Sequence, residues 1–421
     1  MGVKKGGLSK KLRKLHSANA WISLFLAVSG ILLYIPPMRA LLGEGRVWVK
    51  QLHIAVGLVS LAVVILYLPS ILKHLRQLSG RRAQQGNLMV VLVLLAGWIG
   101  SGIILWRYRS FPPAWNNTAL LVHDLLTWIG IPYALYHSFT RSRWLIKAGR
   151  DDARNVTAPP NKPLKVIDLG SYEPSTGRVF RHISRRSFIK VGVGAIMAAA
   201  VLPPFTRWLT SVVGDSNLSS LQELESMPAD VLKLTPLPDS LPPKGGGAKG
   251  NFRIYTVTDI PKFDPEKWTF AVDGLVNRPF QWNWTEFLAF PRQVQVSDFH
   301  CVTGWSVNSC TWEGIPLNQL LEYAGVKDGV KLVKFYSTDG EYTDNITIEQ
   351  TWMEDVMIVL MLDGRPIPRE MGGPVRLVVP QMYAYKSVKW LNRIELIDTD
   401  HIGYWEKRGY AKDAWIWVPP M

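Results

Sequence analysis

The sequence predicts a multi-domain protein in which an all-α transmembrane part, with four helices and a fifth anchor helix, precedes a mixed α+β soluble domain. Four long apolar runs lie within the first 140 of the 421 residues. The charge is divided as well, because residues 1–250 hold 31 Lys and Arg against 11 Asp and Glu, whereas residues 251–421 hold 17 against 22. This split, without any nucleic-acid-binding motif, argues against a nucleic-acid partner. A chain of this length also exceeds a single hydrophobic core.

The membrane part is expected from the length of the apolar runs. Each run is close to the ~20 residues that a helix needs to cross a bilayer. With their flanks the runs form a predicted four-helix transmembrane domain, residues 1–145. The four runs cover residues 18–36, 52–72, 87–106 and 119–137.

The rest of the chain divides by composition. A basic loop occupies residues 146–187, and a weaker apolar run predicts a fifth transmembrane or export helix at 188–212. Pro and Gly are frequent in residues 213–250, which indicates a linker. Residues 251–421 contain short apolar alternations broken by Gly and Pro, a pattern typical of a strand-rich soluble domain with a few short helices.

The basic residues predict an orientation. They concentrate before the first run, between the second and third runs, and in the 146–187 loop. By the positive-inside rule these segments and the N-terminus are cytoplasmic, so the C-terminal domain is extracytoplasmic. The segment 184–190, Ser-Arg-Arg-Ser-Phe-Ile-Lys, resembles a twin-arginine export signal. The resemblance implies the twin-arginine export machinery as a partner. Ala198-Ala199-Ala200 is a candidate cleavage site, but we favour a retained anchor, which predicts a multi-pass protein of a bacterial or archaeal cell membrane.

Histidines at the ends of the apolar runs are candidate haem ligands, because imidazole is a common axial ligand of haem iron and ionisable residues at membrane depth are functional candidates. His123 and His137 lie 14 residues apart on one predicted helix. That spacing is nearly four turns and ~21 Å, so both side chains share a face. His53 is the expected outer partner of His123, and either His16 or His74 is the inner partner of His137. Interfacial histidines without a ligand role are the alternative.

This arrangement resembles the di-haem four-helix cytochrome b subunits of membrane formate dehydrogenases and hydrogenases. The resemblance implies two b haems and exchange of electrons with a membrane quinone or quinol. Carried over to this sequence, the haem iron ligands are His16, His53, His123 and His137, with His74 as the alternative inner ligand.

One of the two cysteines lies in a distinctive segment, His300-Cys301-Val302. An inert buried cysteine, a disulfide between Cys301 and Cys310, and a soft-metal ligand are the three possibilities. Segments around Cys301 resemble the sulfite oxidase superfamily of molybdopterin enzymes, in particular the exported branch typified by the catalytic subunit of bacterial methionine-sulfoxide reductase. The similar segments are WTFAVDG at 268–274, HCVTGWS at 300–306, WEGIPL at 312–317, GPVRL at 373–377 and KSVKW at 386–390.

By this resemblance Cys301 is the catalytic thiolate ligand of molybdenum in a molybdenum–molybdopterin cofactor. Arg376 and Lys389 would bind the pterin phosphate as cations, as in ordinary phosphate recognition. The implied cofactor-binding residues are Arg253, Tyr255, Thr256, Ser337, Arg376, Ser387, Val388 and Lys389.

Two departures from the family bear on the substrate. Met371 stands where the reductase branch has Asn and sulfite oxidases have His, which removes one cofactor hydrogen bond. Residues 302–310 contain no cation, whereas sulfite oxidases place arginines there to hold an oxyanion. We therefore expect a membrane-bound molybdenum oxidoreductase that exchanges electrons with quinone through b haems and reduces an extracytoplasmic sulfoxide-type compound, either a small molecule or an oxidised protein methionine. The alternatives are a sulfite-type dehydrogenase and a non-catalytic haem electron-transfer or sensory protein.

Overall fold

The computed structural model of the protein describes residues 10–35, 38, 41–42, 45–78, 80–140, 185–213, 227–256 and 258–416. Contacts divide the chain into two compact units, residues 1–124 with 211–421, and residues 125–210. Most of the predicted basic loop 146–187 and part of the predicted linker lie outside the described residues.

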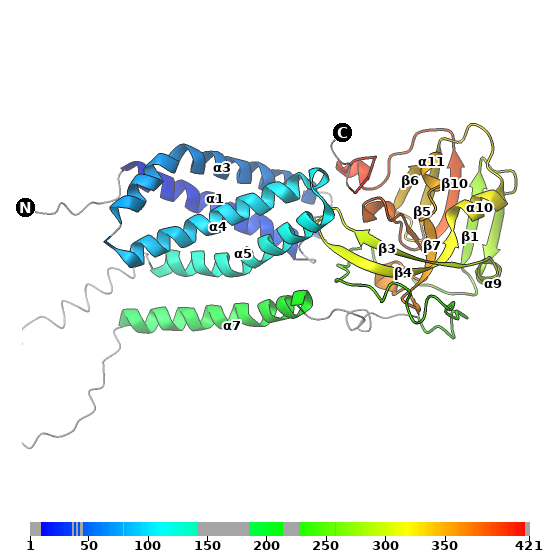
Figure 1. Cartoon of the computed structure of the whole chain (residues 1–421), viewed down its shortest axis with the longest axis horizontal. Helices are drawn as coiled ribbons and strands as arrows, with labels where there is room; N and C mark the ends of the chain where they lie inside the picture. The colour runs from blue at the N-terminus through cyan, green and yellow to red at the C-terminus, as the bar shows by residue number, and fades with distance from the viewer. Residues whose placement is uncertain are drawn as a thin grey trace, which may run out of the picture. The chain divides into compact units, whose positions relative to one another are not determined.

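The first unit begins with long apolar helices. Helix α1 packs against α3, and α3 packs against α4 (Figure 1). The helices extend beyond the predicted apolar runs because their polar and basic ends continue the same backbone hydrogen bonding. Their bounds are α1 (Lys10–Tyr34), α3 (Gly45–Gln77) and α4 (Arg82–Trp106), followed by a 3-10 turn η1 (Tyr108–Ser110) and the start of α5 (Pro113–Thr140).

The second unit contains the remainder of α5 and all but the last three residues of helix α7 (Arg185–Val213). The ring of Trp128 contacts Phe205 with centroids 6.2 Å apart, and a Cβ atom added to Gly194 would lie 3.9 Å from the ring of Tyr136. Since later positions of α5 meet earlier positions of α7, the two helices run antiparallel. The predicted twin-arginine signal, 184–190, lies partly outside the described residues, and of its arginines only the helical backbone is described.

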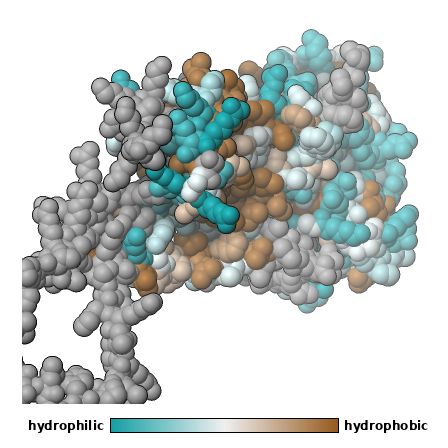
Figure 2. Space-filling view, turned by 60° about the vertical axis from the view of Figure 1, so that its left-hand side comes forward, coloured by the Kyte–Doolittle hydropathy of each residue, from teal (hydrophilic) through white to brown (hydrophobic). Residues whose placement is uncertain are grey.

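Five helices of the described chain, α1, α3, α4, α5 and α7, are long and apolar enough to cross a membrane. This finding confirms the five predicted apolar helices. Large apolar side chains remain exposed on them, and Figure 2 shows hydrophobic side chains gathered on the surface in the middle of the view. Such exposure is unfavourable in water and is expected of a surface that faces lipid. Examples are Trp48, Leu66, Val93, Leu135 and Val191.

The C-terminal part of the first unit is a mixed α and β domain with two five-stranded sheets, as predicted. One sheet has the order β2-β1-β10-β5-β6, in which only β1 and β10 pair in parallel. Its strands are β1 (Thr269–Gly274), β2 (Phe280–Asn283), β5 (Leu332–Ser337), β6 (Thr343–Thr347) and β10 (Leu391–Ile397). The other sheet is antiparallel, with the order β3-β4-β7-β8 and with β9 also paired to β7. Its strands are β3 (Gln293–His300), β4 (Ser306–Pro316), β7 (Met357–Leu362), β8 (Arg365–Pro366) and β9 (Arg376–Val378).

Short helices and turns connect the strands. Helices α9 and α11 each begin with a capping box, in which a side chain at the start of the helix and one three residues later satisfy each other's backbone amides. The bounds are α9 (Trp284–Leu288), α10 (Leu317–Ala324) and α11 (Ile348–Thr351), with 3-10 turns η2 (Arg369–Met371), η3 (Ala384–Lys386) and η4 (Glu406–Arg408).

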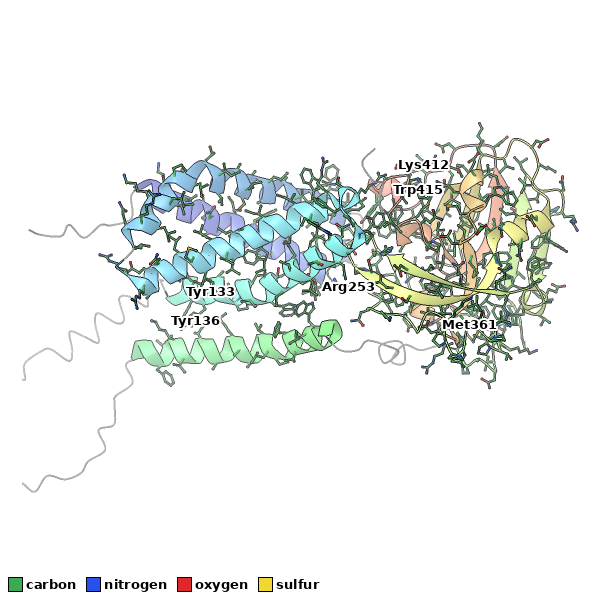
Figure 3. The ribbon with its side chains drawn as sticks, viewed as in Figure 1. Tyr133, Tyr136, Arg253, Met361, Lys412 and Trp415 are labelled. Atoms are coloured by element: carbon green, nitrogen blue, oxygen red, sulfur yellow. The ribbon has the colours of Figure 1, made fainter. Side chains whose placement is uncertain are left out.

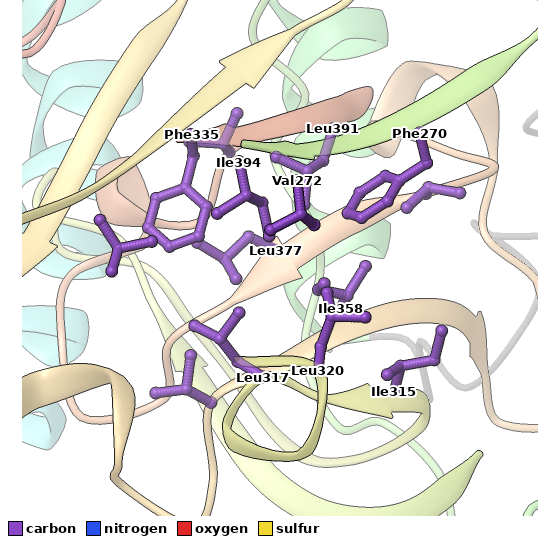
Figure 4. Packing of buried hydrophobic residues seen from close by; sticks show 14 of the residues in the cluster. Phe270, Val272, Ile315, Leu317, Leu320, Phe335, Ile358, Leu377, Leu391 and Ile394 are labelled. Carbon is purple, nitrogen blue, oxygen red and sulfur yellow. The ribbon is translucent and has the colours of Figure 1, made fainter. Parts of the chain in front are cut away.

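The main hydrophobic core holds these sheets in place (Figure 4). Alternate residues of β1, Phe270 and Val272, are buried, as expected for a strand with one face in the core. Every residue of β7 is buried, which indicates that this strand is covered on both faces. The core also contains Leu377 and Val388, so it fixes the segments that carry the predicted phosphate-binding residues.

Candidate functional site

Cys301 lies at the end of β3, in the tight turn that leads to β4. The backbone amide of Cys301 donates to the Trp305 carbonyl at 2.9 Å, and the amide of Gly304 donates to the Cys301 carbonyl at 2.9 Å. Gly304 has a φ of +100°, which glycine adopts without steric strain. The Cys301 thiol is partly exposed and lies 3.2 Å from the hydroxyl of Thr303. The turn therefore presents this sulfur on the domain surface.

Cys310 has a different environment. Its side chain is fully buried within β4, and burial raises the pKa of its thiol well above the ordinary value. Neither of these two described cysteines forms a disulfide, so the Cys301–Cys310 bond considered from the sequence is absent. Since a thiolate is the form that binds soft metals, Cys301 is the better candidate ligand of the two.

Arg376 lies close enough to Lys389 to lower the pKa of the Lys389 ammonium. Arg376 is only 3% exposed, and its guanidinium donates to the carbonyls of Met371 at 2.5 Å and Ser387 at 3.2 Å. Burial lowers its pKa to about 10. The Lys389 ammonium donates to the carbonyls of Glu370 at 2.6 Å and Tyr255 at 3.0 Å.

Burial, followed by repulsion from Arg376, lowers the pKa of Lys389 to about 7. None of the ion pairs among the described residues includes either cation. Gly372 allows Lys389 to approach, because its φ is +101° and an added Cβ would lie 2.6 Å from the Lys389 Cγ atom. Two partly desolvated cations without a paired carboxylate suit a bound anion.

The other predicted cofactor-binding residues beside this pair are mostly buried. The Ser387 hydroxyl oxygen accepts from the Val379 amide at 3.1 Å, and the Val388 amide donates to the Lys386 carbonyl at 3.1 Å. Ser337 is buried at the end of β5, where its hydroxyl accepts from the Asp339 amide at 3.3 Å. Thr256 is partly buried. The side chain of Met371 is buried in an apolar cluster, and its carbonyl holds Arg376.

Arg253 and Tyr255 contact residues of the apolar helices. The Arg253 guanidinium pairs with the carboxylate of Asp124 at 3.2 Å (Arg253 is labelled in Figure 3). The Arg46 guanidinium lies 4.7 Å from the centre of the Tyr255 ring and 4.4 Å from that of Trp405. Tyr255 therefore contacts Lys389 with its carbonyl and α3 with its ring.

Two of the predicted haem-ligand histidines face each other in the first unit. The rings of His53 in α3 and His123 in α5 have centroids 6.5 Å apart and planes at 67°. The hydroxyl of Ser29 lies 2.8 Å from Nδ1 of His53, and the hydroxyl of Ser101 lies 3.0 Å from Nδ1 of His123. Sequence reasoning missed both serines, although a serine followed by glycine within two of the apolar runs was a visible signal.

The inner histidines are less fully described. His137 stacks on Tyr133, with ring centroids 6.0 Å apart, in the second unit (Tyr133 is labelled in Figure 3). The side chain of His16 lies outside the described part of α1. His74 is partly buried in the last turn of α3. The inner ligand pair therefore stays a prediction.

Comparison with known proteins identifies the family. The oxidoreductase molybdopterin binding domain matches residues 257–405. "Uncharacterized oxidoreductase YuiH" of Bacillus subtilis (strain 168) is 34% identical over 168 residues, which cover 39% of this chain and 84% of that protein. The chain belongs to the molybdopterin-binding oxidoreductases. The resemblance noted from the segments around Cys301 is thereby confirmed, and the protein is an enzyme of this type.

Two further relatives match this chain over different lengths. "Putative protein-methionine-sulfoxide reductase subunit YedZ1" of Azospira oryzae is 30% identical over 156 residues, 37% of this chain and 59% of that protein. "Protein-methionine-sulfoxide reductase catalytic subunit MsrP" of Campylobacter jejuni is 23% identical over 239 residues, 53% of this chain and 76% of that protein.

Among solved structures, the sulfane dehydrogenase SoxCD from Paracoccus pantotrophus matches with 24% identity and a TM-score of 0.31. The match covers 33% of this chain and 40% of that one. A likeness of this extent supports no conclusion about mechanism.

Proposed function

We propose that this protein is a membrane-bound, quinone-linked molybdenum oxidoreductase that reduces a sulfoxide-type substrate outside the membrane with electrons delivered through b haems. The observation that carries the proposal is the facing pair His53 and His123, located on apolar helices of the same chain that contains the molybdopterin-binding domain. The quinone, the haems and the direction of electron flow are parts of the proposal.

The spacing of the two rings fits one metal ion between them. An imidazole nitrogen lies about 2 Å from a bound metal ion and about 1 Å from its own ring centre, so two imidazoles on one ion have centres roughly 6 Å apart. The observed separation of 6.5 Å is close to this value. A bound haem would supply one-electron redox chemistry at this position. The inner haem would be held by His137 with His16 or His74, which rests on the sequence alone.

The molybdenum cofactor fits the residues of the soluble domain. Cys301 offers a partly exposed thiol, and Arg376 and Lys389 offer two cations without a paired carboxylate among the described ion pairs. When bound, the cofactor would supply two-electron oxygen-atom transfer. Reduction of one sulfoxide consumes two electrons and two protons and releases one water molecule, and oxidation of one quinol to quinone provides those electrons and protons.

The turn that carries Cys301 contacts α5, which carries His123, and α4, which carries Ser101 beside the ring of His123. A Cβ atom added to Gly304 would lie 2.9 Å from Cδ2 of Leu105 and 3.4 Å from Cβ of Leu120. Leu105 is four residues after Ser101, and Leu120 is three residues before His123, so each is about one helical turn away. This contact supports direct electron transfer between the two centres.

Substrate and location rest on the relatives and the sequence. The printed names of two relatives include protein-methionine-sulfoxide reductase, and residues 302–310 lack the cations expected of a sulfite pocket. We therefore favour an S-oxide, either a small molecule or an oxidised methionine in a protein. The export signal at 184–190 would place the domain outside the membrane. In a variant with Arg185→Lys and Arg186→Lys, the domain should become protected from external protease.

The test begins with the molybdenum and haem content of the purified full chain. Haems reduced with dithionite should be reoxidised by methionine sulfoxide. Cys301→Ser should abolish this reoxidation and keep the haem spectrum, whereas Cys310→Ala is the control that should retain it. Reduction of the haems by added sulfite would contradict the proposed direction, and a protein without haem after reconstitution would refute the haem pathway.

A further inference from the structure

We propose that Ser29 and Ser101 are positioning residues that hold His53 and His123 in the tautomer and orientation needed to bind haem iron, and that they lower the reduction potential of that haem. The inference rests on the proposed haem between these two histidines.

Both serines lie within apolar helices and are almost fully buried. Ser29 is 4% exposed in α1, and Ser101 is 5% exposed in α4. Each hydroxyl oxygen has two kinds of neighbour. The first is the backbone carbonyl four residues earlier, Phe25 at 2.8 Å for Ser29 and Gly97 at 2.7 Å for Ser101. The second is the histidine Nδ1 atom, at 2.8 Å for His53 and 3.0 Å for His123.

These distances decide where the protons lie. A serine hydroxyl has one hydrogen to donate and lone pairs that accept. The contacts with the carbonyls match the usual length of an O–H···O bond, and a carbonyl oxygen accepts only, so the hydroxyl hydrogen points to the carbonyl. If it pointed to the imidazole instead, two acceptor oxygens would face each other below 3 Å. The hydroxyl therefore accepts from the histidine, and Nδ1 carries the ring proton.

The resulting tautomer is the one that binds iron through Nε2. A neutral imidazole has one protonated nitrogen and one with a lone pair, so a proton on Nδ1 leaves the lone pair on Nε2. Metal-binding histidines commonly donate the other ring N–H to a nearby acceptor, which fixes the ring and increases its basicity. Ser29 and Ser101 supply that acceptor among apolar helices, where few polar side chains are available.

The same arrangement of a serine, a glycine and a histidine ring occurs twice. Each serine is followed by a glycine that borders the ring, since a Cβ atom added to Gly30 would lie 3.5 Å from Cε1 of His53, and one added to Gly102 would lie 3.8 Å from Cε1 of His123. Cε1 is bonded to Nε2, so the glycines keep the space beside the iron-binding nitrogen free of side chains. The two Ser-Gly pairs come from different helices, α1 and α4. Because the same contact with a histidine arises independently on each helix, chance is a poor explanation for it.

The expected effect on the haem has a definite sign. Donation from Nδ1 to an acceptor makes the imidazole a stronger electron donor and stabilises the ferric state relative to the ferrous state. Loss of such a partner typically costs about 10–100-fold in metal affinity. We expect removal of one acceptor to weaken the binding of ferric iron relative to ferrous iron by about tenfold, the low end of that range. For a one-electron couple that factor raises the reduction potential by about 59 mV.

The experiment uses the full chain purified in detergent, with Ser29→Ala and Ser101→Ala tested separately. Optical redox titration should show a higher potential for one haem, and the same one in both variants. The low-spin EPR signal of that haem should also change, because its shape depends on the angle between the two imidazole planes. Ser29→Thr and Ser101→Thr should restore both values, since threonine keeps a hydroxyl that bonds the preceding carbonyl in a helix.

Thr118 provides the matched control. Its hydroxyl donates to the Ala114 carbonyl four residues earlier at 2.9 Å in the same way, but the site is exposed, and Thr118→Ala should leave the potential and EPR signal unchanged. Unchanged potentials in both serine-to-alanine variants with full haem content would overturn the inference and leave the haem proposal standing. If alanine causes loss of the haem, retention with threonine supports the inference and equal loss with threonine overturns it. A wild-type protein without haem would instead overturn the proposed function.

Discussion

Lys389 provides a test of the phosphate site through its pKa. The pKa falls from 10.5 to about 7 because the ammonium is desolvated and repelled by Arg376. Each pKa unit corresponds to about 1.4 kcal/mol, so protonation of Lys389 costs a few kcal/mol in the free site after allowance for its partial exposure. A phosphate bound beside Lys389 favours the charged form and recovers part of this energy.

The sign of the pH dependence follows from proton counting. Between pH 7 and 10.5 the free site holds fewer protons than the phosphate-bound site, so binding takes up a proton. The affinity for the pterin phosphate therefore decreases as the pH rises above about 7, by at most about tenfold per pH unit. Lys389→Arg keeps its positive charge throughout this range and should abolish the dependence.

The assay measures retained cofactor. Purified full chain is incubated at pH values from 6.5 to 9.5, separated from released cofactor by gel filtration, and analysed for molybdenum. The wild-type protein should lose cofactor progressively above neutral pH, whereas Lys389→Arg should give a flat profile. Identical profiles for the two proteins, or no loss from either, would show that Lys389 does not bind the phosphate.

Two further predictions concern the soluble domain. Iodoacetamide should alkylate Cys301 but not Cys310 in folded, cofactor-free protein, because Cys310 is buried and its thiol pKa is raised; peptide mass spectrometry checks this, and labelling of Cys310 at an equal rate would contradict it. Lys386→Met should destabilise the domain by about 3–5 kcal/mol in chemical denaturation, because it leaves buried carboxylates without their cation, and an unchanged midpoint would contradict it. Those carboxylates belong to Asp344, 2.8 Å from the ammonium, and Glu406, 2.5 Å from it.

The apolar helices were predictable because crossing a bilayer requires a long uninterrupted apolar segment, which composition alone reveals. Their ends were less predictable. The run 52–72 lies within α3, Gly45–Gln77, because polar and basic residues continue a helix beyond its apolar part. The mixed soluble domain and its family followed from ordered motifs around Cys301 and are confirmed.

Contacts between residues far apart in the sequence were harder to predict than the helices and strands themselves. Gly57 follows His53 by four residues in the same helix, but the space beside Gly57 is open, and it is Gly30 of another helix that borders the His53 ring. The role of Arg253 at the molybdenum cofactor stays a prediction, and its ion pair with Asp124 is a contact that the sequence did not indicate. Which charge meets which partner depends on the packing of separate elements, and no local pattern encodes it.

A short segment without regular secondary structure, residues 253–255, contacts elements of both proposed redox centres, which argues that they work together. Arg253 pairs with Asp124, the neighbour of His123 in α5, and Tyr255 packs its ring against Arg46, seven residues before His53 in α3. The carbonyl of that same tyrosine accepts from Lys389. A phosphate that draws the ammonium of Lys389 toward itself therefore acts on a backbone group only two residues from the Asp124 ion pair. Because both sites share these contacts, we expect loss of the molybdenum cofactor to alter the signal of the haem between His53 and His123.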